Sequence, residues 1–172
     1  MVAVYYNEIR KGVGAVKLLF KQRFFTFTDN FDIYDEKGKK AYVVEGQLTF
    51  GHCFKIYDSQ NREVGTVRQK LFQFLPKFDL YLGQQHIGSI RKELTLLKPN
   101  YQIDYNGWHV VGDWLQWDYT IVDGSGREVA KISKELLNLT DTYSILIHNP
   151  GDALCALMVV LAIDAGKCSR RD

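Results

Sequence analysis

A short pattern of apolar and polar residues recurs six times along the 172 residues of this chain. An aromatic side chain is followed two positions later by an aliphatic one, and the residue between them is polar in every copy. Because side chains alternate between the two faces of a strand, this pattern predicts strands that bury one face and expose the other. The pairs are Phe31 and Ile33, Phe54 and Ile56, Phe78 and Leu80, Tyr101 and Ile103, Tyr119 and Ile121, and Tyr143 and Ile145.

These pairs belong to longer units that each consist of a strand, a turn and a second strand. Residues typical of hairpin turns, such as Gly, Asn and Asp, join one unit to the next. A unit used about six times, with two strands each, predicts about twelve antiparallel strands in up-and-down order. Four copies align without a gap, at residues 20–35, 67–82, 90–105 and 132–147, and two looser copies lie at 44–58 and 111–123.

The segment after residue 148 breaks this pattern and predicts a helix. Asn149 is a suitable N-cap, Pro150 suits the first helical position, and Gly166 can end the helix. Residues 153–163 are all apolar, which falls short of the ~20 residues that a bilayer span needs. A helix that is apolar around its whole circumference has to be enclosed by protein, and a barrel of about twelve strands is wide enough to enclose it.

We therefore predict a mainly β fold, a closed antiparallel barrel of about twelve strands around a central, buried, hydrophobic C-terminal helix. The barrel is expected over about residues 16–148 and the helix over about residues 150–166. Both are expected in one domain of residues 1–172, because a chain of this length with 46% hydrophobic residues suits one sizeable core.

Four phrases of the sequence are distinctive in content and order, namely KQRFFTFTDNFDIYDEKG, VEGQLTFG, VRQKLFQFLPKFDLY and ISKELLNLTDTYSI. They resemble the LURP-one-related family, which shares the tubby C-terminal fold with the phospholipid scramblases. The resemblance runs from about residue 16 to 166 and implies the tubby-like barrel with its central helix. It also implies a ligand class, because the barrel surface of tubby proteins binds phosphoinositides.

Charge is distributed unevenly along the chain, although the net charge is only +2. Residues 1–99 carry +6 and residues 100–172 carry −4, counting Lys, Arg, Asp and Glu. Basic residues of neighbouring units predict an outer patch that attracts anionic phospholipid headgroups. The alternative is a set of solvated residues that protects the barrel from edge pairing. The candidate anion-binding residues are Arg68, Lys70, Lys77, Arg91, Lys92 and Lys98.

Strict alternation along the strands would point Gln69, Lys92 and Lys134 into the barrel. A buried lysine is costly unless it is paired, for example Lys134 with Asp141 across its own hairpin. We favour the alternative that a β-bulge turns these side chains out to solvent, because bulges are frequent in strongly curved barrels.

The sequence predicts no catalytic activity, no cofactor and no metal site. It contains no HExxH, CxxC, GxSxG, P-loop or GxGxxG motif, and the adjacent His52 and Cys53 would face opposite ways on a strand. A nucleic-acid partner is not expected, because the charge is nearly balanced and no recognition motif occurs. The histidines are scattered, at His52, His86, His109 and His148, and the odd set Cys53, Cys155 and Cys168 suggests no disulfide framework.

Three functions from different classes remain open. The first is a non-catalytic binding module for anionic lipid or a membrane surface. The second is a protein-interaction scaffold, and the third is a scramblase-like membrane protein that inserts its C-terminal helix. Because the N-terminal residues lack the form of a signal peptide, the expected location is the cytoplasm, with a peripheral position at the membrane under the first hypothesis.

Overall fold

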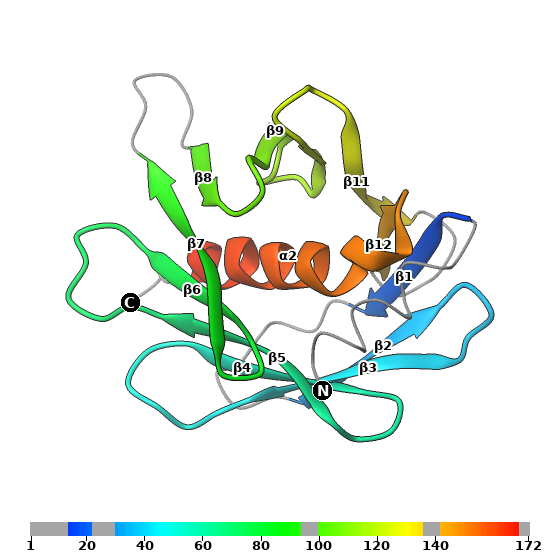
Figure 1. Ribbon diagram of the computed structural model, residues 1–172, viewed down its shortest axis with the longest axis horizontal. Coiled ribbons are helices and arrows are strands. Elements are labelled where there is room, and N and C mark those ends of the chain that lie inside the picture. The colour runs from blue at the N-terminus through cyan, green and yellow to red at the C-terminus, as the bar shows by residue number, and fades with distance from the viewer. Residues whose placement is uncertain (1–13, 22–29, 94–99, 136–141, 169–172) are drawn as a thin grey trace.

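A closed barrel of antiparallel strands surrounds one helix in the computed structural model, which describes residues 14–21, 30–93, 100–135 and 142–168 (Figure 1). The predicted fold class is confirmed. Each strand pairs with its neighbours in the sequence, and β1 also pairs with β12 to close the barrel. The strands are β1 (Val16–Lys21), β2 (Asn30–Asp35), β3 (Lys40–Gly46), β4 (Cys53–Asp58), β5 (Glu63–Gln69), β6 (Lys77–Leu82), β7 (Gln85–Glu93), β8 (Asn100–Asp104), β9 (His109–Asp113), β10 (Asp118–Val122), β11 (Glu128–Glu135) and β12 (Thr142–Ile147).

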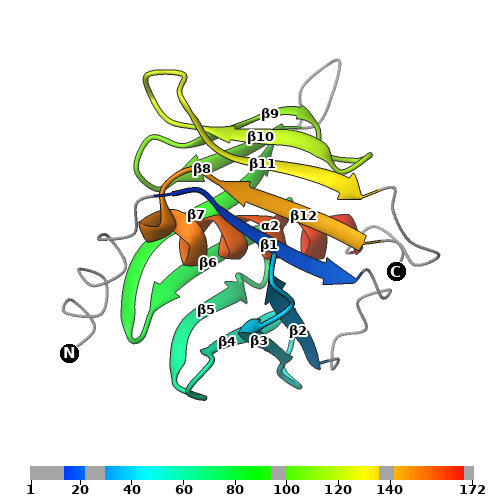
Figure 2. The ribbon, with the colours of Figure 1, turned by 90° about the vertical axis from the view of Figure 1, so that its right-hand side faces the viewer.

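The helix α2 (Ala153–Cys168) runs through the inside of the barrel, behind β1 and β12 in the view of Figure 2. A short 3-10 turn, η1 (Pro150–Asp152), precedes it, and the side chain of Asn149 accepts a hydrogen bond from the Gly151 amide at 3.1 Å. Every side chain between Cys155 and Ala165 is 5% exposed or less. The helix is therefore enclosed on all sides, as its uniform apolar surface requires.

Gly166 does not end the helix, in contrast to the expectation, because α2 continues to Cys168. A Cβ atom at this position would lie 2.5 Å from the Tyr101 hydroxyl oxygen. The Tyr101 hydroxyl in turn donates a hydrogen bond to the Ile163 carbonyl at 3.3 Å. Gly166 therefore allows β8 to approach the helix closely rather than providing a cap.

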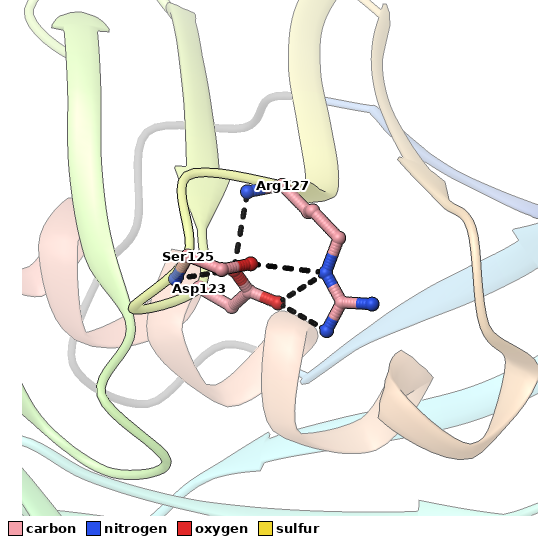
Figure 3. A network of polar contacts seen from close by, with 3 residues as sticks. All are labelled: Asp123, Ser125 and Arg127. Carbon is pink, nitrogen blue, oxygen red and sulfur yellow. Dashed lines mark hydrogen bonds and ion pairs between the residues drawn. The ribbon is translucent and has the colours of Figure 1, made fainter.

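Three hairpin turns repeat one hydrogen-bonded design around an aspartate. In the β10–β11 turn, Asp123 Oδ1 accepts bonds from the Ser125 and Arg127 amides at 2.9 and 3.1 Å (Figure 3). Its Oδ2 lies 2.8 Å from the Arg127 guanidinium. Gly126 takes φ +81°, a left-handed conformation that glycine adopts without strain. The same arrangement of Asp with the amides two and four residues later occurs at Asp35 and Asp58.

Four of the hairpins shift register next to their turns, where the second strand holds one extra residue. These bulged residues are apolar and contact the core. They are Ala41, Val64, Ile87 and Val129.

The expected bulges at Gln69, Lys92 and Lys134 do not occur. Pairing is regular through Lys92 and Lys134, and the Lys92 side chain is buried with 1% exposed. Lys134 is nevertheless exposed and Gln69 is half-buried. Bulges are thus a property of the turn-proximal ends of the hairpins, where the tight turn strengthens the local twist.

The two ends of the barrel differ. The aspartate turns lie at one end, here called the turn end (residues 36–39, 59–62 and 123–127). The opposite end, here called the loop end, carries residues 47–52, 70–76 and 114–117. The helix α2 finishes at the loop end, on the left of Figure 1.

Candidate lipid-binding surface

Three cations lie in one row across three neighbouring strands. Lys70 follows β5, and its amide donates to the Lys77 carbonyl of β6 at 2.8 Å. Lys77 is paired with Arg91 on β7, whose guanidinium bonds the Gln102 side chain of β8. Arg68 is exposed one row away, opposite Asp79. The structure therefore brings four of the six predicted residues onto one outer surface, here called the basic face (Arg68, Lys70, Lys77 and Arg91).

One carboxylate, Asp79, lies within the basic face and offsets part of its charge. The Lys70 ammonium lies 3.1 Å from the Asp79 carboxylate, and the Tyr81 hydroxyl donates a hydrogen bond to the same carboxylate at 3.4 Å. The hydrogen bond to Asp79 raises the pKa of Lys70 above its usual value. Neither Lys77 nor Arg91 forms an ion pair with any residue in the described ranges. The charge of these two side chains is therefore available to an external anion.

Lys92 does not belong to the basic face, and this part of the prediction is wrong. Its side chain is buried, with the ammonium 5.3 Å from the centre of the Trp114 ring. The aromatic lining of the loop end provides a cation–π contact there, so regular strand alternation can point a lysine inward. Lys98 lies outside the described residues.

Large apolar side chains at the loop end are exposed beside the basic face, and the sequence pattern did not predict them. Their exposed fractions are 88% for Leu48, 92% for Phe50, 101% for Phe72 and 93% for Phe74. They lie in the β3–β4 loop (47–52) and the β5–β6 loop (70–76), here called the aromatic loops. Several large apolar side chains exposed on neighbouring loops indicate a candidate interaction site. The spacing of Phe72 and Phe74 resembles a strand, but the following Pro76 is a sequence signal for a loop.

The two aromatic loops contact each other. The Gln69 amide donates to the His52 carbonyl at 2.7 Å, and the His52 amide donates to the Gln69 side chain at 2.9 Å. Gly51 takes φ +86°, and a Cβ atom there would lie 2.9 Å from a methyl carbon of Leu71. The loops therefore act as one surface.

Phe72 has an unusual backbone conformation, with φ +59°. A bulky residue rarely takes this left-handed conformation, because its Cβ atom crowds the backbone. Its side chain is fully exposed, so packing onto the barrel does not explain its presence. Such residues concentrate at functional positions.

A polar cluster lies inside the barrel at the same end, around the last turns of α2. Asp164 is 5% exposed, and burial raises its pKa to about 7 although the charge of Lys167 opposes the shift. The Lys167 ammonium lies 4.0 Å from the centre of the Trp117 ring. The hydroxyl of Tyr119 is also buried, and burial together with the charge of Asp164 holds its pKa well above the usual value. These groups face the core, so they affect stability rather than the outer surface.

A comparison with protein families decides the assignment. The LURP-one-related family matches residues 16–164 of this chain. The chain belongs to the LURP-one-related family. It is 27% identical over 150 residues to the uncharacterized protein YxjI of Bacillus subtilis (strain 168), a match that covers 87% of this chain and 92% of that protein.

A solved structure is similar to this LURP-one-related barrel. The X-ray structure of an Arabidopsis thaliana protein matches with a TM-score of 0.64 and 18% identity. The match covers 89% of this chain and 92% of that one, so the two proteins share the fold. The LURP-one-related barrel is not a known class of enzyme.

Within the described residues, no group of three or more His, Cys, Asp and Glu side chains is placed to hold a metal ion. His52 contacts the rings of Phe54 and Phe78 inside the barrel instead. Across the described part of the chain, no helix has the length and apolar character needed to cross a bilayer.

Proposed function

We propose that this LURP-one-related barrel is a non-catalytic module that binds the surface of membranes containing anionic phospholipid. The observation that carries the proposal is the row formed by Lys70, Lys77 and Arg91 at the loop end of the barrel. Under this proposal the protein is peripheral to the membrane, and α2 stays inside the barrel as a structural element.

The magnitudes favour weak, salt-dependent binding through charge alone. Each basic residue near an anionic leaflet contributes ~1 kcal/mol, so the row supplies only a few kcal/mol. Such a contribution is screened over about 8 Å at physiological ionic strength. Asp79 reduces the contribution of Lys70, because it already holds that ammonium. Lys77 and Arg91 are therefore expected to contribute most.

The test is sedimentation with vesicles of phosphatidylcholine alone or mixed with phosphatidylserine. The wild-type protein should bind the anionic vesicles more tightly, and added salt should weaken the binding. The double variant Lys77→Glu with Arg91→Glu should lose roughly tenfold or more in affinity.

A matched control places the same charge change elsewhere. The exposed Lys37 lies in the β2–β3 turn, and the exposed Lys131 lies on β11. The double variant Lys37→Glu with Lys131→Glu changes the net charge equally, so it should bind almost as the wild type does. Equal losses in both double variants would indicate nonspecific attraction, and equal binding to neutral vesicles would refute the proposal.

A further inference from the structure

We infer that the aromatic loops insert into the bilayer. The protein then contacts the anionic headgroups through its basic face and the apolar layer beneath them through these loops. This inference rests on the proposed function and deepens it. It assigns a role to Leu48, Phe50, Phe72 and Phe74, which the basic face alone does not explain.

The position of the cations relative to the aromatic side chains supports insertion. Lys70 precedes the exposed part of the β5–β6 loop and Lys77 follows it. The cations therefore flank a segment whose apolar side chains extend into solvent. At a membrane, the flanking cations would lie among the charged headgroups and the apolar side chains would lie in the hydrocarbon. Interfacial protein segments are arranged in this way.

The exposure of the side chains favours lipid over a protein partner. Phe50, Phe72 and Phe74 are each more than nine-tenths exposed, so they extend separately and do not form a packed patch. The energetic centres of protein interfaces are usually well-packed, preformed clusters. Acyl chains are fluid and surround separate side chains without such a cluster. The neighbouring Lys77 and Arg91 complement an anionic surface as well.

The backbone conformation of Phe72 makes it possible to test whether this side chain serves membrane binding or the stability of the fold. A left-handed φ of +59° suits Asn better than Phe, and the exposed ring contributes no packing. Replacing Phe72 with Asn should therefore leave the melting temperature unchanged or raise it. If the ring inserts into lipid, the same replacement should weaken membrane binding.

The first measurement pairs vesicle affinity with thermal stability. Phe72→Asn and Phe74→Ser should each reduce affinity for vesicles containing phosphatidylserine by about tenfold, the effect of withdrawing one large apolar side chain from an apolar layer. The control is Val111→Ser on β9, where the side chain is 52% exposed away from the aromatic loops. This variant should bind as the wild type does. Unchanged affinity in both loop variants would overturn the insertion.

The second measurement reports how deeply the β5–β6 loop enters the bilayer. Phe74→Trp should show additional fluorescence quenching by vesicles with brominated acyl chains, relative to the wild type, whose Trp108, Trp114 and Trp117 are buried. Vesicle binding without additional quenching would overturn insertion while leaving the proposed function in place. Absence of binding to anionic vesicles would overturn both. Affinity of the loops for a protein instead, with no vesicle binding, would also count against both.

Discussion

At the scale of single residues, Asp164 should make the stability of the barrel depend on pH. Its pKa is raised from 3.8 to about 7 in the folded protein by burial. Between these two values the folded state holds a proton that the unfolded state has lost, so the free energy of unfolding falls as pH rises through this window. Above about pH 7 both states are ionised, and the contribution stops changing.

The variant Asp164→Asn tests this expectation. At pH 8 its free energy of unfolding should exceed that of the wild type by an amount on the order of a few kcal/mol at most, because an amide in the core carries no charge to desolvate. Its melting temperature should therefore be higher. The difference should shrink as pH falls towards 4. Thermal melts of both proteins from pH 4 to pH 8 provide the measurement, and a difference that does not vary with pH would contradict the raised pKa.

Single residues also show how far local sequence rules extend. The cap at Asn149 was predictable, because an Asn-Pro step before an apolar run is a local signal. The burial of Lys92 was not, since it depends on Trp114, which is distant in sequence and reaches the same end of the barrel only after folding. Gly166 was misread for the same reason, because its role depends on Tyr101 of another strand.

At the scale of elements, the aspartate turns should contribute to stability at neutral pH. The hydrogen bonds that Ser125 and Arg127 donate to Asp123 hold the pKa of its carboxyl below the usual value. A lowered pKa means that the stabilisation is present above the ordinary pKa of 3.8 and is lost as pH falls below it. Acid should therefore weaken the turn.

Asp123→Ala removes both the turn bonds and the ion pair with Arg127, so its melting temperature at pH 7 should fall by several degrees. Ser125→Ala removes only the hydroxyl contacts and should cost less. Calorimetry at pH 7 and at pH 3 compares the variants. The expected result is a smaller deficit for Asp123→Ala in acid, and an equal deficit at both values would contradict the role of the charge.

The helix α2 tests the enclosed core. Val159 is fully buried, so Val159→Asp places a carboxylate in an apolar interior and should cost several kcal/mol, enough to unfold a marginally stable domain. The half-exposed Val111 provides a control, because Val111→Asp keeps its charge in contact with water. Calorimetry distinguishes them, and a Val159→Asp variant that melts within a few degrees of the wild type would place the helix outside the barrel.

The strands followed from the sequence because an aromatic residue, a polar residue and an aliphatic residue repeat in each unit. The helix followed because this repeat ends before the uninterrupted apolar run of residues 153–163. The aromatic loops did not follow, since Leu71, Phe72 and Phe74 come directly after β5 and are residue types that are common in strands, so they resemble an extension of β5. Alternation reports which residues share a face, but it does not report where pairing ends. The bulges were likewise misplaced, because their positions follow from turn geometry.

At the scale of the whole molecule, the two ends of the barrel differ in structure. The turn end is tied by repeated aspartate networks. The loop end places exposed apolar side chains next to Lys77 and Arg91. Rigid scaffolds commonly present function on loops at one end, and this barrel follows that arrangement under the proposed function.

Barrel closure and much of the basic face could be predicted, because neighbouring units of an up-and-down sheet lie side by side. That reasoning placed Lys77 and Arg91 together correctly. It could not identify the loop end as a surface, because this requires knowing that the β3–β4 and β5–β6 loops lie against each other at Gly51 and Leu71.

The most direct test of membrane binding through the aromatic loops is hydrogen–deuterium exchange with and without vesicles containing phosphatidylserine. We expect membrane binding to slow amide exchange in the aromatic loops, at residues 47–52 and 70–76, while the turn end at residues 36–39 and 123–127 exchanges as before. Slowed exchange at the turn end instead, or no change in the aromatic loops of vesicle-bound protein, would contradict it.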